Sequence, residues 1–277
     1  MKKLQDNNIV YAPTDLASFL KCNHLSWLDH KKLTGELSIN KTQNDPFIDL
    51  LRDRGLDHEQ NYLKKLKSTY SQVVEISNEK SFETQVELTT NAICSGADII
   101  YQPLFYDYPW SGYADFLIKT TTPSFLGDFS YEILDAKLAF SAKPDYILQL
   151  CMYSELLTST QKLLPEKIHL LLGNQTTTTF YLSDFFYYYL HTKEQIEKFL
   201  KKLPAKSYPQ PSKHCNVCGG REHCNAQWEN DNHLSIIANI QNSQTEKLNK
   251  SNIYTVESFI KTDTGIQIAN LNQDTRL

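Results

Sequence analysis

The sequence predicts an α/β fold in which a mixed central β-sheet is flanked by helices. Three observations carry this prediction. Short apolar runs of strand length alternate along the chain with longer segments whose apolar residues have helical spacing. Two of the short runs lie between 112 and 137 and are separated by a loop containing Thr, Pro, Ser and Gly. A group of cysteines follows the last long helical segment, which indicates a metal centre near the end of the domain.

The first predicted element is a helix over 14–30. Its apolar residues recur at helical spacing, and Thr14 or Asp15 suits the N-terminal cap. Cys22 falls inside this helix. Residues 31–44 are polar and are expected to form a loop.

The second predicted helix covers 45–68. Asp45 suits its cap and Pro46 its first turn. One face of this helix carries Leu51, Gly55, His58 and Tyr62. The glycine costs the helix about 1 kcal/mol relative to alanine, so we expect another group to pack closely there. The histidine on this inward stripe is either a hydrogen-bonded core residue or a metal ligand.

The remaining elements alternate between the two kinds of secondary structure. Beside the central pair, strands are predicted over 71–77, 98–106, 167–173 and 177–182. Helices are predicted over 80–96, 144–157 and 184–202.

The two central runs each carry an aspartate where an apolar residue would pack better. Asp115 lies in the first run and Asp135 in the second. Lys137 is two residues beyond Asp135, so in a strand both side chains project from the same face. A buried carboxylate is costly unless it is paired or binds a metal, so these residues form a candidate divalent-metal site with a cation beside it. The alternative is that they are charges of an edge strand that face water.

Composition and charge narrow the class of protein. The 277-residue chain is 40% hydrophobic and 22% charged, as expected for a globular, core-forming protein. Its net charge of −4 gives no global basic field, so nucleic-acid binding would need a local basic groove. No apolar run approaches a membrane span, and the N-terminus lacks the apolar core of a signal peptide. We therefore expect a cytoplasmic protein that does not bind membranes, whose six cysteines are thiols or metal ligands.

Three of the cysteines are clustered. Cys215 and Cys218 form a C-x2-C pair, and Cys224 follows after five intervening residues. The segment is rich in proline and glycine, so we expect a loop that a bound centre would order. A four-ligand set needs one more donor. The candidates are Cys22, Cys94 and Cys151, with His214 and His223 as nitrogen alternatives. Thiolates suit zinc and an iron–sulfur cluster equally well, so the spacing does not decide between them.

Taken together, these motifs resemble the iron–sulfur-containing, RecB-like branch of the PD-(D/E)XK nuclease superfamily. That branch has a helical cysteine, a G-x-x-H element, a G-x-x-D strand, a D/E-x-K strand, a Q-x-x-x-Y helix and a late cysteine triplet. All six occur here in this order: Cys22; Gly55 to His58; Gly112 to Asp115; Asp135 to Lys137; Gln149 to Tyr153; and Cys215, Cys218 and Cys224. The stretch GDFSYEILDAKLA, 127–139, also resembles GDWSYEVxDTKLA of a bacterial family of uncharacterised RecB-like nucleases.

The resemblance implies a restriction-endonuclease-like core and a metal-dependent deoxyribonuclease. The expected activity is that of an exonuclease on single-stranded or end-containing DNA, in DNA repair or defence. His58, Asp115 and Asp135 would bind Mg²⁺ or Mn²⁺, and Lys137 would orient the attacking water or stabilise the transition state. Ala114 stands where the superfamily motif has proline. Glu59 adjoins His58 and is the alternative first ligand, although only His58 continues the helical stripe.

The resemblance also implies roles for two residues of one predicted helix and for four cysteines. Gln149 and Tyr153, one helical turn apart, would hold the DNA backbone and the catalytic lysine in place. The cysteines would bind a 4Fe-4S cluster that staples the two ends of the domain, with structural Zn²⁺ as the alternative. The proposed ligands are Cys22, Cys215, Cys218 and Cys224.

We expect a nuclease domain over 1–229 and a helical tail over 230–277. Within the tail, 246–260 resembles half of a helix-hairpin-helix element, with Asn252 where glycine is usual, since asparagine tolerates the left-handed conformation. Such elements bind phosphate backbones, and the alternative is a short helix pair that packs on the domain. Relatives continue into a helicase or a further nuclease domain, which would act in the same pathway. The rival function is a catalytically inactive nucleic-acid-binding module that keeps the cluster.

Overall fold

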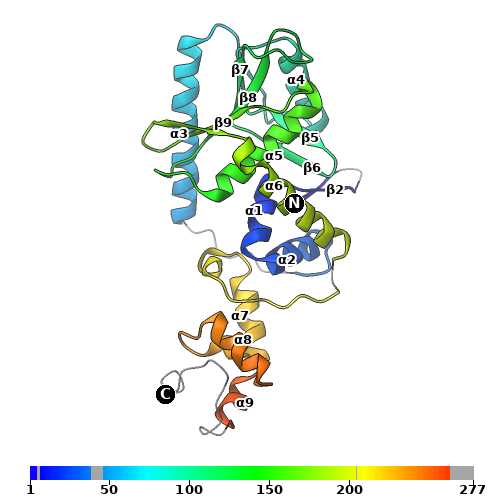
Figure 1. Ribbon diagram of the computed structural model, residues 1–277, viewed down its shortest axis with the longest axis vertical. Helices are drawn as coiled ribbons and strands as arrows, with labels where there is room; N and C mark the ends of the chain where they lie inside the picture. Colours follow the sequence, from blue (N-terminus) through cyan, green and yellow to red (C-terminus); the bar gives the residue numbers. More distant parts are fainter. Residues whose placement is uncertain (5–6, 39–45, 204, 263–277) are drawn as a thin grey trace. The chain divides into compact units, whose positions relative to one another are not determined.

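The chain divides into two compact units (Figure 1). The computed structural model describes residues 1–4, 7–38, 46–203 and 205–262. The first unit comprises Met1–Leu20 and Gln43–Pro204, and the second comprises Lys21–Thr42 and Ala205–Leu277. This division differs from a boundary at residue 229, because residues 27–37 pack with residues 215–228. The apolar group that joins them is Trp27, Leu28, Leu37, Cys215, Cys224 and Trp228.

The first unit is built around a six-stranded sheet with the order β10-β9-β8-β7-β4-β3. Its strands are β3 Val73–Glu75, β4 Ile99–Tyr101, β7 Phe116–Thr120, β8 Ser130–Ala136, β9 Lys167–Leu171 and β10 Thr177–Tyr181. The pairs β3–β4 and β8–β9 are parallel, and the other neighbours are antiparallel. The predicted α/β class with a mixed, helix-flanked sheet is thereby confirmed.

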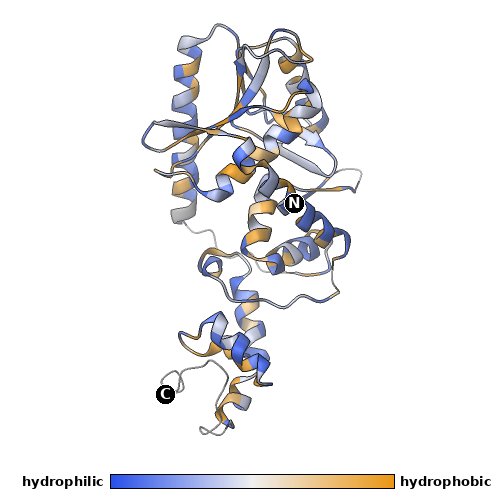
Figure 2. Ribbon diagram, viewed as in Figure 1, coloured by the Kyte–Doolittle hydropathy of each residue, from blue (hydrophilic) through white to orange (hydrophobic). Residues whose placement is uncertain are grey.

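One face of the sheet is covered by α3, Pro46–Thr69. Leu63 and Leu66 of this helix pack in one apolar cluster with Phe116 of β7 and Leu134 of β8. Figure 2 shows hydrophilic and hydrophobic residues alternating along α3, as expected for a helix with one buried face.

The larger core lies on the other face. It joins α4 (Phe82–Cys94), α5 (Pro144–Gln161) and α6 (Ser183–Lys201) to the sheet, with Ile133 of β8 in its middle. Successive residues of a strand point to opposite faces, so Asp135 lies on the same face as Ile133. Among the helices that the structure describes, none is long and apolar enough to cross a membrane.

The chain breaks twice where the sequence predicts continuous strands. Residues 98–106 form β4 and β5 (Leu104–Asp107), because Gln102 adopts a left-handed φ of 50° directly before Pro103. The second break is at Ala114 and Asp115, between β6 (Trp110–Tyr113) and β7. Strands β5 and β6 form a separate two-stranded sheet.

The predicted helix 14–30 is also two helices. α1 covers Pro13–Lys21 and α2 covers Asn23–Leu33. Cys22 is extended, with φ −165° and ψ 105°, and is the N-cap of α2, so the prediction that it lies inside a helix is wrong. Thr14 and Asp15 lie within α1. The Asp15 carboxylate nevertheless accepts the Ala12 N–H at 2.7 Å, which gives the start of α1 a capping hydrogen bond.

The predicted stripe on α3 is buried only in part. His58 is 6% exposed, but Leu51 is 46% exposed. No described atom lies within 4 Å of a Cβ placed on Gly55, so the expected close packing at this glycine is wrong. The expected cap Asp45 lies outside the described residues.

The second unit is helical beyond α2. Its later elements are η1 Lys213–Val217, α7 Arg221–Asn230, η2 Leu234–Ile236, α8 Asn242–Lys250 and α9 Val256–Ile260. Cys224 therefore lies in a helix, not in the loop expected from the surrounding prolines and glycines. Leu234, Leu248 and Ile253 form a small core between these helices. Asn252 adopts the expected left-handed conformation, with φ 62°.

Candidate functional site

Two aspartates of neighbouring strands meet at one end of the sheet. The β7–β8 register pairs Phe116 with Leu134, so Asp115 and Asp135 come next on their strands. The Ala136 N–H donates to Asp115 Oδ2 at 2.6 Å, which confirms that the Asp115 carboxyl reaches across to β8. The Gln102 N–H donates to the Asp115 carbonyl at 2.8 Å and fixes the break before β7.

Lys137 completes a charged group with these acids. Its Nζ lies 2.5 Å from Asp135 Oδ2 in an ion pair. Asp135 is 1% exposed, and among the described residues Oδ2 has no hydrogen bond of good geometry to supplement that ion pair. The Lys137 ammonium also lies 5.6 Å from the centre of the Tyr146 ring, which covers it from the side of α5.

The electrostatics of this group oppose the charged form of Asp115. Burial, then the charges of Asp135 and Glu59, raise the pKa of the Asp115 carboxyl well above its ordinary value. Burial alone would lower the pKa of Lys137, but Asp135 and Asp115 outweigh it and the pKa is raised. The lysine is therefore a cation at neutral pH, and one carboxyl is held in an environment that disfavours its ionisation.

The two candidate first ligands are neighbours on α3, and in the part of the chain that the structure describes only Glu59 has contacts that lead to Asp115. Glu59 Oε1 accepts a hydrogen bond from Gln102 Nε2 at 2.9 Å, and its charge acts on Asp115. His58 Nδ1 lies 3.0 Å from Gln175 Nε2, whereas the buried Nε2 has no partner in the part of the chain that the structure describes. His58 also lines an open surface pocket with Arg54, Asn61, Leu138 and Gln175. Both candidate first ligands are thus buried here.

Tyr153 of α5 faces the acids, while the Gln149 side chain makes no hydrogen bond within the described ranges. Burial, then Asp135 and Asp115, raise the pKa of the Tyr153 phenol well above its ordinary value. Gly112 makes this approach possible, because a Cβ on it would lie 2.9 Å from the Tyr153 ring and 2.8 Å from Pro13 Cδ. Gly112 thus has a steric role that the spacing alone does not reveal.

The four predicted cluster ligands line one cavity of the second unit. Cys22 caps α2, Cys215 lies in η1, Cys218 follows η1, and Cys224 lies in α7. Burial, then the other three cysteines, raise the pKa of the Cys224 thiol to about 12. The other two cysteines lie in the first unit, Cys94 exposed and Cys151 buried.

Backbone N–H groups point at two of these sulfurs. The Ser212 N–H donates to Cys215 Sγ at 3.3 Å, and the Gly220 N–H donates to Cys218 Sγ at 3.4 Å. Gly220 packs tightly, since a Cβ on it would lie 2.9 Å from Leu28 Cδ1. Across the described ranges, no group of three or more His, Cys, Asp or Glu side chains has the arrangement that a single metal ion needs. The structure therefore assigns no metal centre by itself.

Histidines also line or flank this cavity. His214, one nitrogen alternative, lines it, whereas His223 lines a separate depression of the second unit. His24 lines the cavity as well. Burial, then His223, lower the pKa of His24 to about 4, so its imidazole is neutral at neutral pH. Sequence reasoning missed His24 because a lone histidine near a cysteine has no diagnostic spacing.

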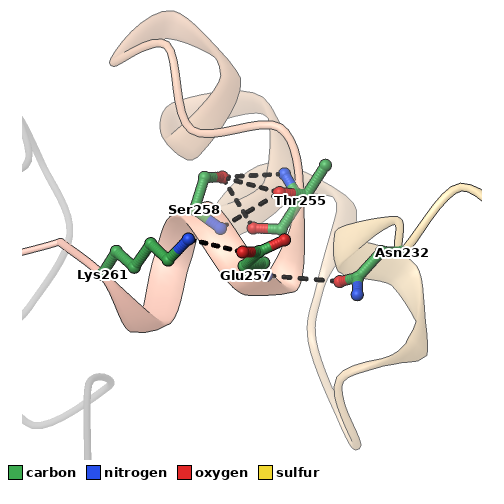
Figure 3. A network of polar contacts seen from close by, with 5 residues as sticks. All are labelled: Asn232, Thr255, Glu257, Ser258 and Lys261. Atoms are coloured by element: carbon green, nitrogen blue, oxygen red, sulfur yellow. Dashed lines mark hydrogen bonds and ion pairs between the residues drawn. The ribbon is translucent and has the colours of Figure 1, made fainter.

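The first backbone N–H groups of α9 donate hydrogen bonds to residues of the second unit (Figure 3). Asn232 accepts the Val256 N–H through its carbonyl at 2.9 Å and the Glu257 N–H through Oδ1 at 3.2 Å. Thr255 Oγ1 accepts the Ser258 N–H at 3.0 Å. The first N–H groups of α9 are thus engaged within the unit, which favours a packing role over phosphate binding.

No protein-family model matches the chain, and no curated protein matches it.

Proposed function

We propose that the chain is a metal-dependent deoxyribonuclease. Its active site would be the acid–lysine group that lies where β7 begins and β8 ends. One observation carries the proposal: two carboxyls and an ammonium are brought together, mostly buried, from neighbouring strands. A structural role alone would not explain two adjacent acids in a largely buried setting, where burial and Asp135 raise the pKa of Asp115 and a lysine ammonium lies beside them.

The donor set fits a hard divalent cation. Asp115 and Asp135 offer carboxylate oxygens, and Mg²⁺ and Mn²⁺ prefer such ligands. Asp135 Oδ2 is buried and lies 2.5 Å from the Lys137 ammonium, without a hydrogen bond of good geometry in the described chain, so this carboxylate can also offer a lone pair to a metal ion. His58 Nε2 is a further buried atom without a partner there, and Glu59 is a third carboxylate beside Asp115. We assign Asp115, Asp135 and His58 as ligands, with Glu59 as the alternative to His58.

A divalent ion bound to these residues supplies an activated water and neutralises phosphate charge. The protein supplies the rest of the chemistry. Lys137 keeps its proton because its pKa is raised, so it acts as a fixed positive charge beside the scissile phosphate and not as a general base. Tyr153 stays a neutral phenol, which can donate a hydrogen bond to a phosphate oxygen. Gln149 has an amide free of described partners and would hold the DNA backbone one helical turn away.

We further propose a 4Fe-4S cluster on Cys22, Cys215, Cys218 and Cys224, with Zn²⁺ as the alternative. The fit rests on four thiols that line one cavity, where burial and the neighbouring cysteines raise the pKa of Cys218 and Cys224. N–H donors to Cys215 and Cys218 would stabilise the thiolate form that either centre requires. Both chemistries stay open here because thiolates suit each of them.

The substrate is proposed as single-stranded or end-containing DNA, cut exonucleolytically in repair or defence, together with a helicase or further nuclease domain. This part rests on the resemblance alone. A cytoplasmic location is proposed because it suits the free cysteines, since that compartment keeps thiols reduced.

The test is a cleavage assay with end-labelled single- and double-stranded DNA and Mg²⁺ or Mn²⁺ on anaerobically purified protein. We expect cleavage by the wild type and losses of at least 100-fold in Asp135→Asn and Lys137→Met. Asp128→Asn and Lys201→Met, which alter exposed residues, are the matched controls and should cleave normally. A folded wild type that binds DNA without cutting it would favour the inactive binding module instead.

A further inference from the structure

The cavity that holds the four cysteines has a fifth polar group. His24, at the second position of α2, lines it together with Cys22, Cys215, Cys218 and Cys224. The imidazole lines the same cavity as the four sulfurs and is not a surface residue, because His24 is only 1% exposed.

The ring is held from two directions. Trp27 stacks on it, with ring centroids 5.5 Å apart and planes 16° apart. Ser207 Oγ lies 2.8 Å from Nδ1. A hydroxyl that donates to Nδ1 leaves the ring proton on Nε2, since neutral imidazole has one donor and one acceptor nitrogen. The orientation of His24 is thus fixed by residues of its own unit.

Nε2 is the remaining nitrogen, and it is buried without a hydrogen-bond partner among the residues described. A buried N–H without an acceptor costs about 1–3 kcal/mol, so such a group in a native fold calls for an explanation. Sulfurs of a bound centre in this cavity are acceptors, and N–H groups already approach Cys215 and Cys218 from the backbone. The histidine would add a side-chain donor to this set.

We propose that His24 donates its Nε2–H to a sulfur of the iron–sulfur centre and thereby raises the reduction potential of that centre. The inference rests on the proposed cluster. A donor to a cluster sulfur stabilises the extra negative charge of the reduced state, so its removal favours the oxidised state. His24 is a positioning and tuning residue in this account, and the cysteines alone bind iron.

The first test compares the wild type with His24→Phe and His24→Gln by protein-film voltammetry on anaerobically purified protein. The phenylalanine has no donor, whereas the glutamine amide keeps an N–H. We expect iron and sulfide contents close to wild type in both variants, a lower potential in His24→Phe and a near-normal potential in His24→Gln. Equal potentials in all three proteins overturn the role of His24 and leave the cluster standing. A wild type without iron and sulfide overturns both.

The second test uses only the wild type and the conservative variant His24→Gln. Wild-type protein labelled with ¹⁵N-histidine is reduced and examined by pulsed electron paramagnetic resonance. A weak nitrogen coupling that disappears in His24→Gln supports an N–H···S contact. A strong coupling, typical of nitrogen bound directly to iron, overturns the donor assignment in favour of a ligand role. No coupling overturns the contact itself.

Discussion

At Asp115 the requirements of folding and of the proposed catalysis oppose each other. The carboxyl is needed as an anion to bind a cation, yet burial and two other acids raise its pKa. Its raised pKa means that the folded protein holds this proton more tightly than the unfolded chain does. Stability should therefore fall as pH rises from the ordinary carboxyl pKa through the raised value, and at neutral pH the charge is a net cost.

Asp115→Asn should consequently stabilise the metal-free protein while it abolishes cleavage. The amide is close in shape, and its oxygen can still accept the Ala136 N–H. In chelator at neutral pH, differential scanning calorimetry should give a Tm a few degrees above that of the wild type, and the gain should shrink at acidic pH. Asp128→Asn, an exposed acid, should change neither property. A lower Tm for Asp115→Asn at neutral pH would contradict the electrostatic account.

Gln149 and Asp135 should separate DNA positioning from metal binding. Gln149→Ala should lower turnover and weaken DNA binding, but leave the metal affinity measured by calorimetry nearly unchanged. Asp135→Ala should lose metal binding by at least tenfold, since it removes a charged ligand. If Gln149→Ala loses metal as severely as Asp135→Ala, or cuts DNA at the normal rate, the positioning role is wrong.

At the scale of elements, the glycines of the G-x-x-D and G-x-x-H motifs differ in how closely they are packed. Gly112 lies in β6 against α1 and α5, whereas Gly55 lies in α3 with open space around it. Gly112→Ala should cost about 1–3 kcal/mol and displace Tyr153, because the new methyl overlaps its ring. Gly55→Ala should stabilise α3 by about 1 kcal/mol. Urea denaturation and the cleavage assay together measure both effects.

Normal activity and stability in Gly112→Ala would show that Tyr153 can move without loss. A destabilised Gly55→Ala would show that an unseen group packs on α3. Together the pair tests whether the motif glycine beside the site is a steric requirement, which the sequence pattern by itself does not state.

The sequence predicts elements with clear periodicity or turn residues well, and it predicts the interruptions of elements poorly. α3, α5, β9 and β10 have strong periodicity or clear turn residues, and the structure confirms them. The breaks at Cys22, at Gln102 and before Phe116 were missed because apolar spacing continues across each. The Gln102-Pro103 pair carried a usable signal, since proline has no backbone N–H to donate within a central strand. Cys22 carried none, because its extended conformation depends on distant packing.

At the scale of the molecule, the candidate centres lie in different units. The acid–lysine group belongs to the first unit and the four cysteines to the second. The motif order in the sequence predicted the acid–lysine group and the four cysteines. It did not predict that Cys22 and α2 belong to the second unit. Contact between residues 21–42 and residues beyond 205 is non-local, so it leaves no periodic pattern in either segment.

The cysteine centre makes a prediction at this scale. Anaerobically purified protein should be brown and contain iron and sulfide, and Cys22→Ser should lose most of the iron and lower the Tm. Cys94→Ser and Cys151→Ser, whose cysteines lie in the other unit, should keep the cluster. Colourless protein with stoichiometric zinc would decide for the alternative metal. Iron retained by Cys22→Ser and lost by Cys94→Ser would reverse the choice of fourth ligand.

The interleaved units have a consequence for synthesis on the ribosome. Leu28 and Trp27 are translated early, but their packing partners Cys224 and Trp228 follow only after about 160 residues of the other unit. At roughly 5–20 residues per second, α2 waits on the order of 10–30 s with its apolar side chains unpaired. The first unit, whose six-stranded sheet lies within residues 73–181, can fold during that interval. Nascent chains thus pass through a state in which the first unit is complete while Cys22 still lacks the other three thiols.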